Sequence, residues 1–122
     1  MPTINEVIER VGRVKPNTID DREKAMWLMG LDGQIYEELT KADSPDREPP
    51  RSWPEDGDKP LLAGAPRDSF YDLYLTAMIE FYMRKYSSYN NTVSLFNEAM
   101  QAFRAWYRRE HRPTRTQVRN AL

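Results

Sequence analysis

The chain has 122 residues, a length that is enough for a single domain over residues 1–122 with a modest core. Its formal net charge is −1. It contains no cysteine, and this excludes a disulfide framework, a thiolate metal site and a thiol nucleophile. Its longest apolar run, of about 14 residues, is shorter than the roughly 18 needed to cross a bilayer, and Met1–Gly12 is amphipathic rather than a signal peptide. A soluble cytoplasmic protein is therefore expected.

A short amphipathic helix is predicted over residues 3–13. Thr3 and Glu6 have the spacing of a capping box, in which each side chain accepts a hydrogen bond from the other residue's backbone N–H. The apolar residues that follow repeat at helical intervals and form one face: Ile4, Val7, Ile8 and Val11.

A second helix is predicted over residues 19–41. Thr18 and Asp21 offer a second capping box at its start. Gly30 and Gly33 lie inside the helix, where each glycine costs about 1 kcal/mol relative to alanine. Their presence indicates either a closely packed neighbour or a bend in the helix.

Residues 42–66 form a long proline-rich loop in this interpretation, because six prolines exclude regular hydrogen bonding through most of the segment. The loop is either partly ordered or wholly disordered, and Trp53 with the pair Leu61-Leu62 favours partial order by offering apolar anchors. Asp56-Gly57-Asp58 reads as a turn, since the other ligands of a calcium loop are missing. The loop is predicted to be the most mobile internal segment of the free protein.

The third helix, predicted over residues 69–89, is apolar on every side except one. Its polar residues Asp72, Thr76 and Glu80 fall on a single line at intervals of four. Such a helix must be covered from several directions, by other helices or by another subunit, so it is predicted to be the central helix. Phe81 belongs either to the core or to a subunit interface.

The fourth helix is predicted over residues 92–111, with the break before it at Asn90-Asn91, because asparagine tolerates left-handed backbone and caps helices. The alternative is one continuous helix from Asp68 to His111. The last residues, 113–122, follow a proline and are predicted to be a mobile tail. The whole chain is thus predicted to be all-α, a small bundle of about four helices.

The C-terminal end is strongly basic. Between residues 104 and 122 it has one glutamate against six arginines, so this end carries +5 and the remainder −6. Arginine suits bidentate pairing with carboxylate or phosphate, which makes this end a candidate site for docking a partner protein; the alternatives are a solvated tail and contact with nucleic-acid phosphate. The candidate docking residues are Arg104, Arg108, Arg109, Arg112, Arg115 and Arg119.

A second candidate surface is a subunit interface. Tyrosine and methionine dominate the third helix, and these residue types are frequent in cores and in subunit interfaces alike. The candidate interface residues are Tyr71, Met78, Tyr82 and Trp53. No catalytic constellation is found: His111 is the only histidine and stands among arginines, so neither an enzymatic activity nor a metal or other cofactor is expected.

Several short stretches outside the proline-rich loop carry a resemblance to a known family. They are Ile4-Asn5-Glu6-Val7-Ile8, Trp27-Leu28, Leu31-Asp32-Gly33-Gln34-Ile35, Tyr74-Leu75, Ala77-Met78-Ile79, Tyr89-Asn90-Asn91 and Leu95-Phe96-Asn97. Through them the chain resembles the small head-tail connector (adaptor) proteins of long-tailed bacteriophages. The 42–66 loop looks longer and more proline-rich than the helical core requires.

The resemblance implies an all-helical structural protein of the virion neck, made in the cytoplasm of the bacterial host. Such a protein is expected to form a twelvefold ring beneath the portal and to extend the DNA channel toward the stopper or tail. Its partners would be further copies of itself, the portal protein, a stopper or tail-completion protein, and DNA passing through without sequence recognition, with no membrane. The competing hypothesis is a small helical regulator that binds nucleic acid through the arginine-rich end.

Overall fold

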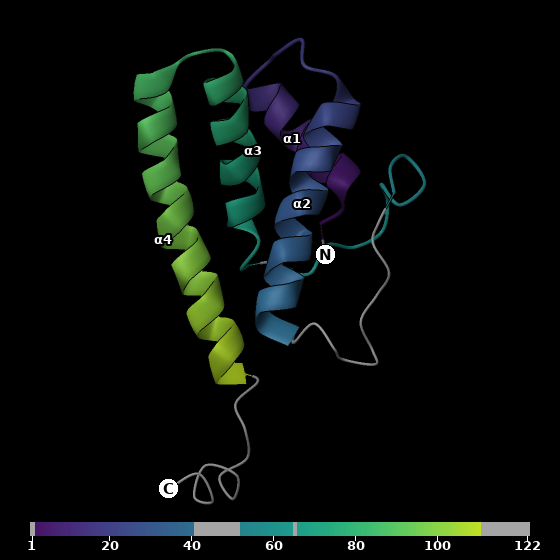
Figure 1. Ribbon diagram of the computed structural model, residues 1–122, viewed down its shortest axis with the longest axis vertical. Helices are drawn as coiled ribbons and strands as arrows, with labels where there is room; N and C mark the ends of the chain where they lie inside the picture. The colour runs from purple at the N-terminus through teal and green to yellow at the C-terminus, as the bar shows by residue number, and fades with distance from the viewer. Residues whose placement is uncertain (1, 41–51, 65, 111–122) are drawn as a thin grey trace, which may run out of the picture.

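A computed structural model describes residues 2–40, 52–64 and 66–110 (Figure 1). The chain is all-α, as predicted, and no β-strand forms within the described ranges. The predicted tail at 113–122 and the first part of the proline-rich loop lie outside them. The four helices are α1 (Ile4–Val14), α2 (Asp21–Thr40), α3 (Ser69–Tyr82) and α4 (Tyr86–Glu110).

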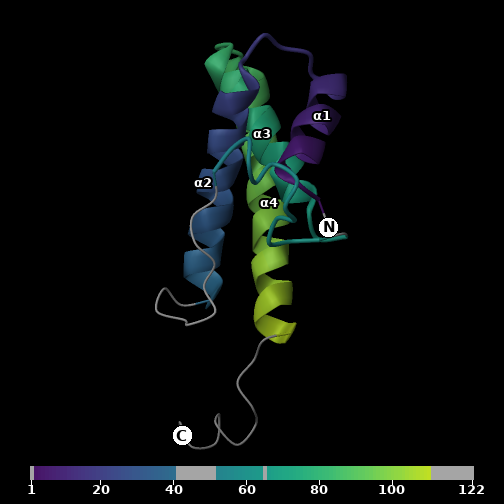
Figure 2. The ribbon, with the colours of Figure 1, turned by 90° about the vertical axis from the view of Figure 1, so that its right-hand side faces the viewer.

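Helix α3 is the central helix, as its composition predicts. It contacts α1, α2 and α4, whereas α1 and α4 have no contact with each other and α2 meets α4 only weakly. Figures 1 and 2 show α3 antiparallel to α4, with α1 and α2 against its other sides. The core is formed by buried apolar residues of all four helices and of the segment before α3, including Val7, Leu28, Leu61, Phe70, Leu75, Ile79 and Phe103.

The starts of the first two helices illustrate one confirmed and one wrong prediction. The Glu6 backbone N–H donates to the Thr3 side chain (3.2 Å), so Thr3 caps α1 as predicted. At α2 the predicted cap was Thr18, but the helix begins later, and it is the Asp20 carboxylate that accepts a hydrogen bond from the Arg22 N–H (3.2 Å). Asp20 is the better cap because its side chain lies one residue before the first helical residue.

The break between α3 and α4 exists, but the predicted position at Asn90-Asn91 is wrong, since both asparagines lie inside α4. The chain turns at Arg84, which has a left-handed backbone (φ 61°). The Arg84 N–H bonds the Phe81 carbonyl (3.0 Å) and the Lys85 N–H bonds the Glu80 carbonyl (2.9 Å). This is the Schellman pattern, which satisfies the last carbonyls of α3 and reverses the chain within three residues.

Residues 52–64, the described part of the proline-rich loop, are attached to the start of α1. Thr3 and Pro60 form an isolated antiparallel bridge, and the Leu61 N–H donates to the Pro2 carbonyl (2.8 Å). Leu61 is almost fully buried, so the predicted leucine anchor is confirmed. We call residues 52–64 the anchored segment.

The glycines of α2 have no close neighbour that explains them. A Cβ atom added at Gly30 or Gly33 would meet nothing within 4 Å in the described part of the chain. The described part of the chain therefore contains no closely packed neighbour of Gly30 or Gly33, which was one of the two predicted explanations for these glycines. Gly57 in the anchored segment differs, because a Cβ there would lie 2.6 Å from the Asn5 side chain.

Candidate interaction surfaces

The predicted polar line of α3 faces α1. The Arg10 guanidinium donates from Nε and Nη2 to the two carboxylate oxygens of Asp72 (2.8 and 2.6 Å). This hydrogen-bonded pairing raises the pKa of Arg10 above its ordinary value, against an opposing effect of burial. The pair fixes the rotation of α3 relative to α1, because a bidentate contact constrains both distance and orientation.

The other end of this line is a buried carboxylate. The Glu80 side chain is 3% exposed, and it accepts hydrogen bonds from the Lys15 ammonium (2.9 Å) and from the Thr92 hydroxyl. A buried charge needs such partners, since removing one of them leaves an uncompensated charge away from water. Glu80 therefore joins α1, α3 and α4 and has a structural role.

Tyr71 was predicted at a subunit interface, and the structure corrects this assignment because the side chain is fully buried within one chain. Its hydroxyl donates to the Asp32 carboxylate (2.6 Å) and accepts from the Ala63 N–H (3.0 Å). Asp32, itself buried, also accepts from the Leu62 N–H (3.2 Å). The network ties α2, α3 and the end of the anchored segment together.

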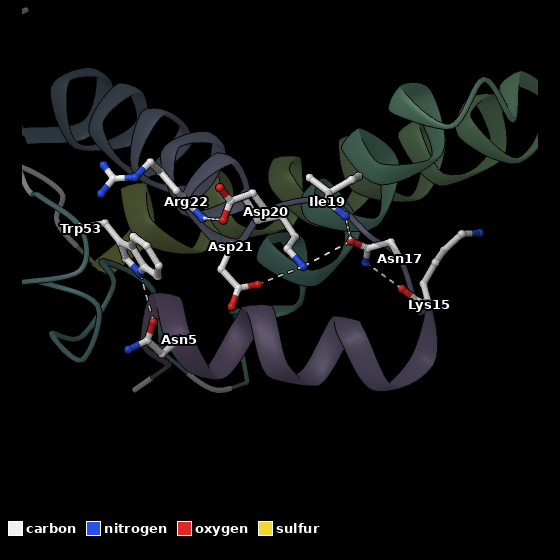
Figure 3. Close-up of polar contacts among 9 residues, drawn as sticks. Asn5, Lys15, Asn17, Ile19, Asp20, Asp21, Arg22 and Trp53 are labelled. Carbon is white, nitrogen blue, oxygen red and sulfur yellow. Dashed lines mark hydrogen bonds and ion pairs between the residues drawn. The ribbon is translucent and has the colours of Figure 1, made fainter.

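Trp53, another predicted interface residue, is half-buried against the start of α1. Figure 3 shows its indole aimed at Asn5, and the indole N–H donates to the Asn5 Oδ1 atom (3.1 Å). The Arg22 guanidinium lies 5.9 Å from the ring centroid, which is a cation–π distance. Asn5 also donates to Asp58 (2.9 Å), so this residue holds both sides of the turn in the anchored segment.

The connection between α1 and α2 is held by its own polar contacts, which Figure 3 also displays. The Asn17 side chain donates to the Lys15 carbonyl (3.0 Å) and accepts from the Ile19 N–H (3.0 Å). The buried Lys24 ammonium contacts Asp21 (3.2 Å) and Asn17 (3.3 Å). These contacts define the entry into α2 and give the polar side chains there a structural role.

Large apolar side chains are exposed where α3 turns into α4. The exposed fractions are 52% for Phe81, 63% for Tyr82, 41% for Met83 and 52% for Tyr86. We call these four residues, together with the exposed cations Arg84 and Lys85 that lie between Met83 and Tyr86, the aromatic end. Tyr82 belongs to the predicted interface and lies beside Trp27 of α2 (6.3 Å between ring centroids), while Met78, one turn earlier, is partly buried.

Phe81 is thereby not a core residue, and its ring contacts only partly cover it. It packs against Tyr86 (5.8 Å between centroids) and Tyr89 (5.1 Å). The next two residues after Met83 are cations, Arg84 and Lys85, and neither forms an ion pair with any residue in the described ranges. The aromatic end thus combines apolar surface with positive charge.

The arginine-rich end is partly engaged within the chain. The Arg104 side chain donates to Glu38 of α2 (3.0 Å), and Arg108 lies 4.0 Å from the same carboxylate. Arg109 is exposed in the last turn of α4. The remaining predicted docking residues, Arg112, Arg115 and Arg119, and the single histidine, His111, lie outside the described residues.

Sequence reasoning missed Arg84 and Lys85 as part of a surface, and it missed the exposure of Phe81, Met83 and Tyr86. The available signal was the pair of adjacent cations that interrupts the apolar run. Within the described ranges no group of three or more acidic or histidine side chains could hold a metal ion, and no helix there is long and apolar enough to span a membrane. Neither protein-family models nor curated proteins nor solved structures gave a match to this chain.

Proposed function

We propose that this protein is a structural adaptor of a bacteriophage neck, which forms a ring below the portal and links the DNA-filled head to the stopper or tail. The observation that carries the proposal is the aromatic end. A small bundle that satisfies its buried charges internally but exposes four large apolar side chains together is suited to binding other proteins, because contiguous exposed apolar surface favours association. The sequence resemblance to head-tail connectors supports the same function.

The basic end fits the role of a docking site for the portal or for the next neck protein. Arg104 and Arg108 are held against Glu38, which positions the last turns of α4 relative to α2. Arg109 extends from this platform into solvent. An oriented base followed in the sequence by further arginines offers a partner several groups suited to pairing with carboxylate or phosphate. The function requires no catalytic step, cofactor or metal.

Light scattering of the purified protein, over a range of concentrations and with portal protein added, tests the proposal. The expected result is assembly of several copies that becomes complete and defined in size when portal rings are present. A protein that neither changes in mass with concentration nor binds portal rings would contradict the adaptor function.

The alternative is a nucleic-acid-binding regulator that uses the same arginines. The ion pairs with Glu38 reduce the charge that Arg104 and Arg108 can offer to phosphate, which favours the adaptor. DNA binding with an affinity that falls steeply with salt would instead favour the regulator, because neutralised phosphates release counterions.

A further inference from the structure

The aromatic end and the first turns of α2 lie at the same end of the bundle. In Figures 1 and 2 the turn between α3 and α4 and the start of α2 are both at the upper end of the molecule. The two surfaces belong to different helices and expose different sets of residues. They adjoin within one chain, where Trp27 of α2 lies beside Tyr82 of α3, and their other exposed residues are open to further copies of the chain.

The first turns of α2 form an acidic surface. Asp20, Asp21 and Glu23 are exposed there against two cations, the exposed Arg22 and the buried Lys24, which pairs with Asp21 (3.2 Å). Met26 is an exposed apolar residue one turn further on. We call Asp20–Glu23 with Met26 the acidic face. Its carboxylates and its methionine are the counterparts that the cations and rings of the aromatic end require.

The intrachain contact between the two regions uses only part of each. Trp27 meets Tyr82, whereas Phe81 and Tyr86 on one side and Met26 on the other remain about half exposed. Beyond Met26, the surface of α2 has no side chains at Gly30 and Gly33, and no atom of the described residues lies within 4 Å of a Cβ added at either position. This part of α2 would let another helix approach closely.

We infer that the aromatic end of one copy binds the acidic face of the next copy. In the ring that the proposed function requires, this contact repeats head-to-tail from copy to copy, and the ring closes when the rotation between copies permits. Both surfaces lie at one level along the bundle, so neighbouring copies can stand side by side with parallel long axes. The inference deepens the proposed adaptor function and rests on it, because it names the surfaces through which the copies of the ring meet.

The size of the surface sets the strength of the contact. Aromatic side chains present about 150–250 Å² each, so three that are about half exposed, together with Met83, offer a few hundred Å² per copy, below the roughly 800 Å² per partner of a typical stable interface. A single contact is therefore weak. Free protein should associate reversibly with rising concentration, and closure of a ring, in which every copy makes two contacts, should stabilise the assembly.

A charge exchange tests the pairing directly. Lys85→Glu and Glu23→Lys are each expected to weaken association in sedimentation or light scattering by roughly threefold to tenfold, because each reversal replaces attraction with repulsion. The double variant, Lys85→Glu with Glu23→Lys, is expected to recover most of the loss. Recovery has a simple reason, since the two reversed charges again face each other with opposite sign.

Three further variants separate the apolar contribution from general surface effects. Tyr86→Ala is expected to weaken association about tenfold or more, as removal of a central aromatic residue does at many interfaces. Leu95→Ala and Glu98→Lys, exposed positions of α4 beyond the aromatic end, serve as matched apolar and charge controls and are expected to leave association unchanged. Helix content and melting temperature of every variant identify any that fail to fold.

The inference is overturned if the full-length protein stays monomeric at all concentrations, or if folded Tyr86→Ala and Lys85→Glu proteins associate like the original. It is also overturned if the double variant is as weak as the two single variants combined. Portal binding is a separate readout. Association that follows these expectations without any portal binding would contradict the adaptor function alone, and portal binding by a monomer would contradict the head-to-tail contact alone.

Discussion

Arg84 is the one non-glycine residue with a positive φ in the described part of the chain. A residue with a side chain at φ 61° is less favourable by roughly 1–2 kcal/mol than in right-handed backbone, because its Cβ crowds the following carbonyl. Arg84→Gly removes this crowding at the cost of greater freedom in the unfolded chain. The variant is expected to raise the free energy of unfolding by roughly 0.5–1 kcal/mol, measured by urea denaturation.

Lys85→Gly is the matched control for this substitution, because Lys85 is the adjacent exposed cation and does not have positive φ. Removing its side chain cannot relieve strain and adds only unfolded-state freedom, so its stability should fall slightly. Equal effects of the two glycine variants would mean that the left-handed conformation of Arg84 carries no energetic consequence.

Tyr71 is a second residue whose side chain stabilises the fold locally, through the two hydrogen bonds of its hydroxyl. Tyr71→Phe keeps the ring in the core but removes the donor to Asp32 and the acceptor for the Ala63 N–H. A buried group that loses its partner costs about 1–3 kcal/mol, so the free energy of unfolding is expected to fall by this amount. Tyr74→Phe, at a half-buried position of the same helix, should change it far less.

At the scale of elements, the anchored segment is held at one end by Trp53 and at the other by Leu61. Trp53→Ala removes the hydrogen bond to Asn5 and the ring beneath Arg22. Hydrogen exchange of residues 52–64 should then accelerate by roughly tenfold to a hundredfold, because local opening requires less free energy. Exchange in α3 and α4 should stay unchanged, as should exchange in a Glu55→Ala control. Faster exchange throughout the chain would mean that Trp53 belongs to the global core instead.

The elements also explain what the sequence could predict. The all-α class, the cap at Thr3 and the centrality of α3 follow from local spacing, which a single helix expresses by itself. The position of the break at Arg84 does not follow from local spacing. The Schellman turn there puts an arginine in left-handed backbone, which this residue type does not indicate. Asn90 and Asn91 are of the residue type that indicates such a break, yet both remain helical.

The candidate surfaces were less predictable, because burial depends on neighbours that the periodicity of one helix cannot identify. Tyr71 and Phe81 are both large aromatic residues of α3. Tyr71 is covered by α2 and the anchored segment, whereas Phe81, beyond the reach of that cover, is half exposed. Likewise the polar line of α3 was evident, but not that Arg10 of α1 and Lys15, the residue that follows α1, would pair with it.

For the whole molecule, the two ends of the bundle differ in what they present. The upper end of the bundle in Figure 1 carries two surfaces, the aromatic end and the acidic face, which are suited to contacts between copies. The other end carries the last turns of α4, where Arg104 and Arg108 share Glu38 and the chain continues into residues 111–122 with three further arginines. Copies that associate through the first end would leave the basic ends side by side, and this repetition favours docking on a ring-shaped partner with many weak contacts.

This arrangement leads to the prediction for the basic end as a docking arm. Truncation after His111 removes Arg112, Arg115 and Arg119 but no residue of the described core, so helix content and melting temperature should stay nearly unchanged. If the protein is the proposed adaptor, attachment to the portal should be lost, because each copy loses three charges that arginine would pair with carboxylate, and the loss would be repeated around a ring. In a phage assembly reaction the expected product is filled heads without tails.

A variant with the three arginines changed to glutamine separates charge from chain length and should fail in the same way. If truncated protein joins heads to tails at normal yield, residues 112–122 are a solvated tail, and portal docking must lie elsewhere on the bundle.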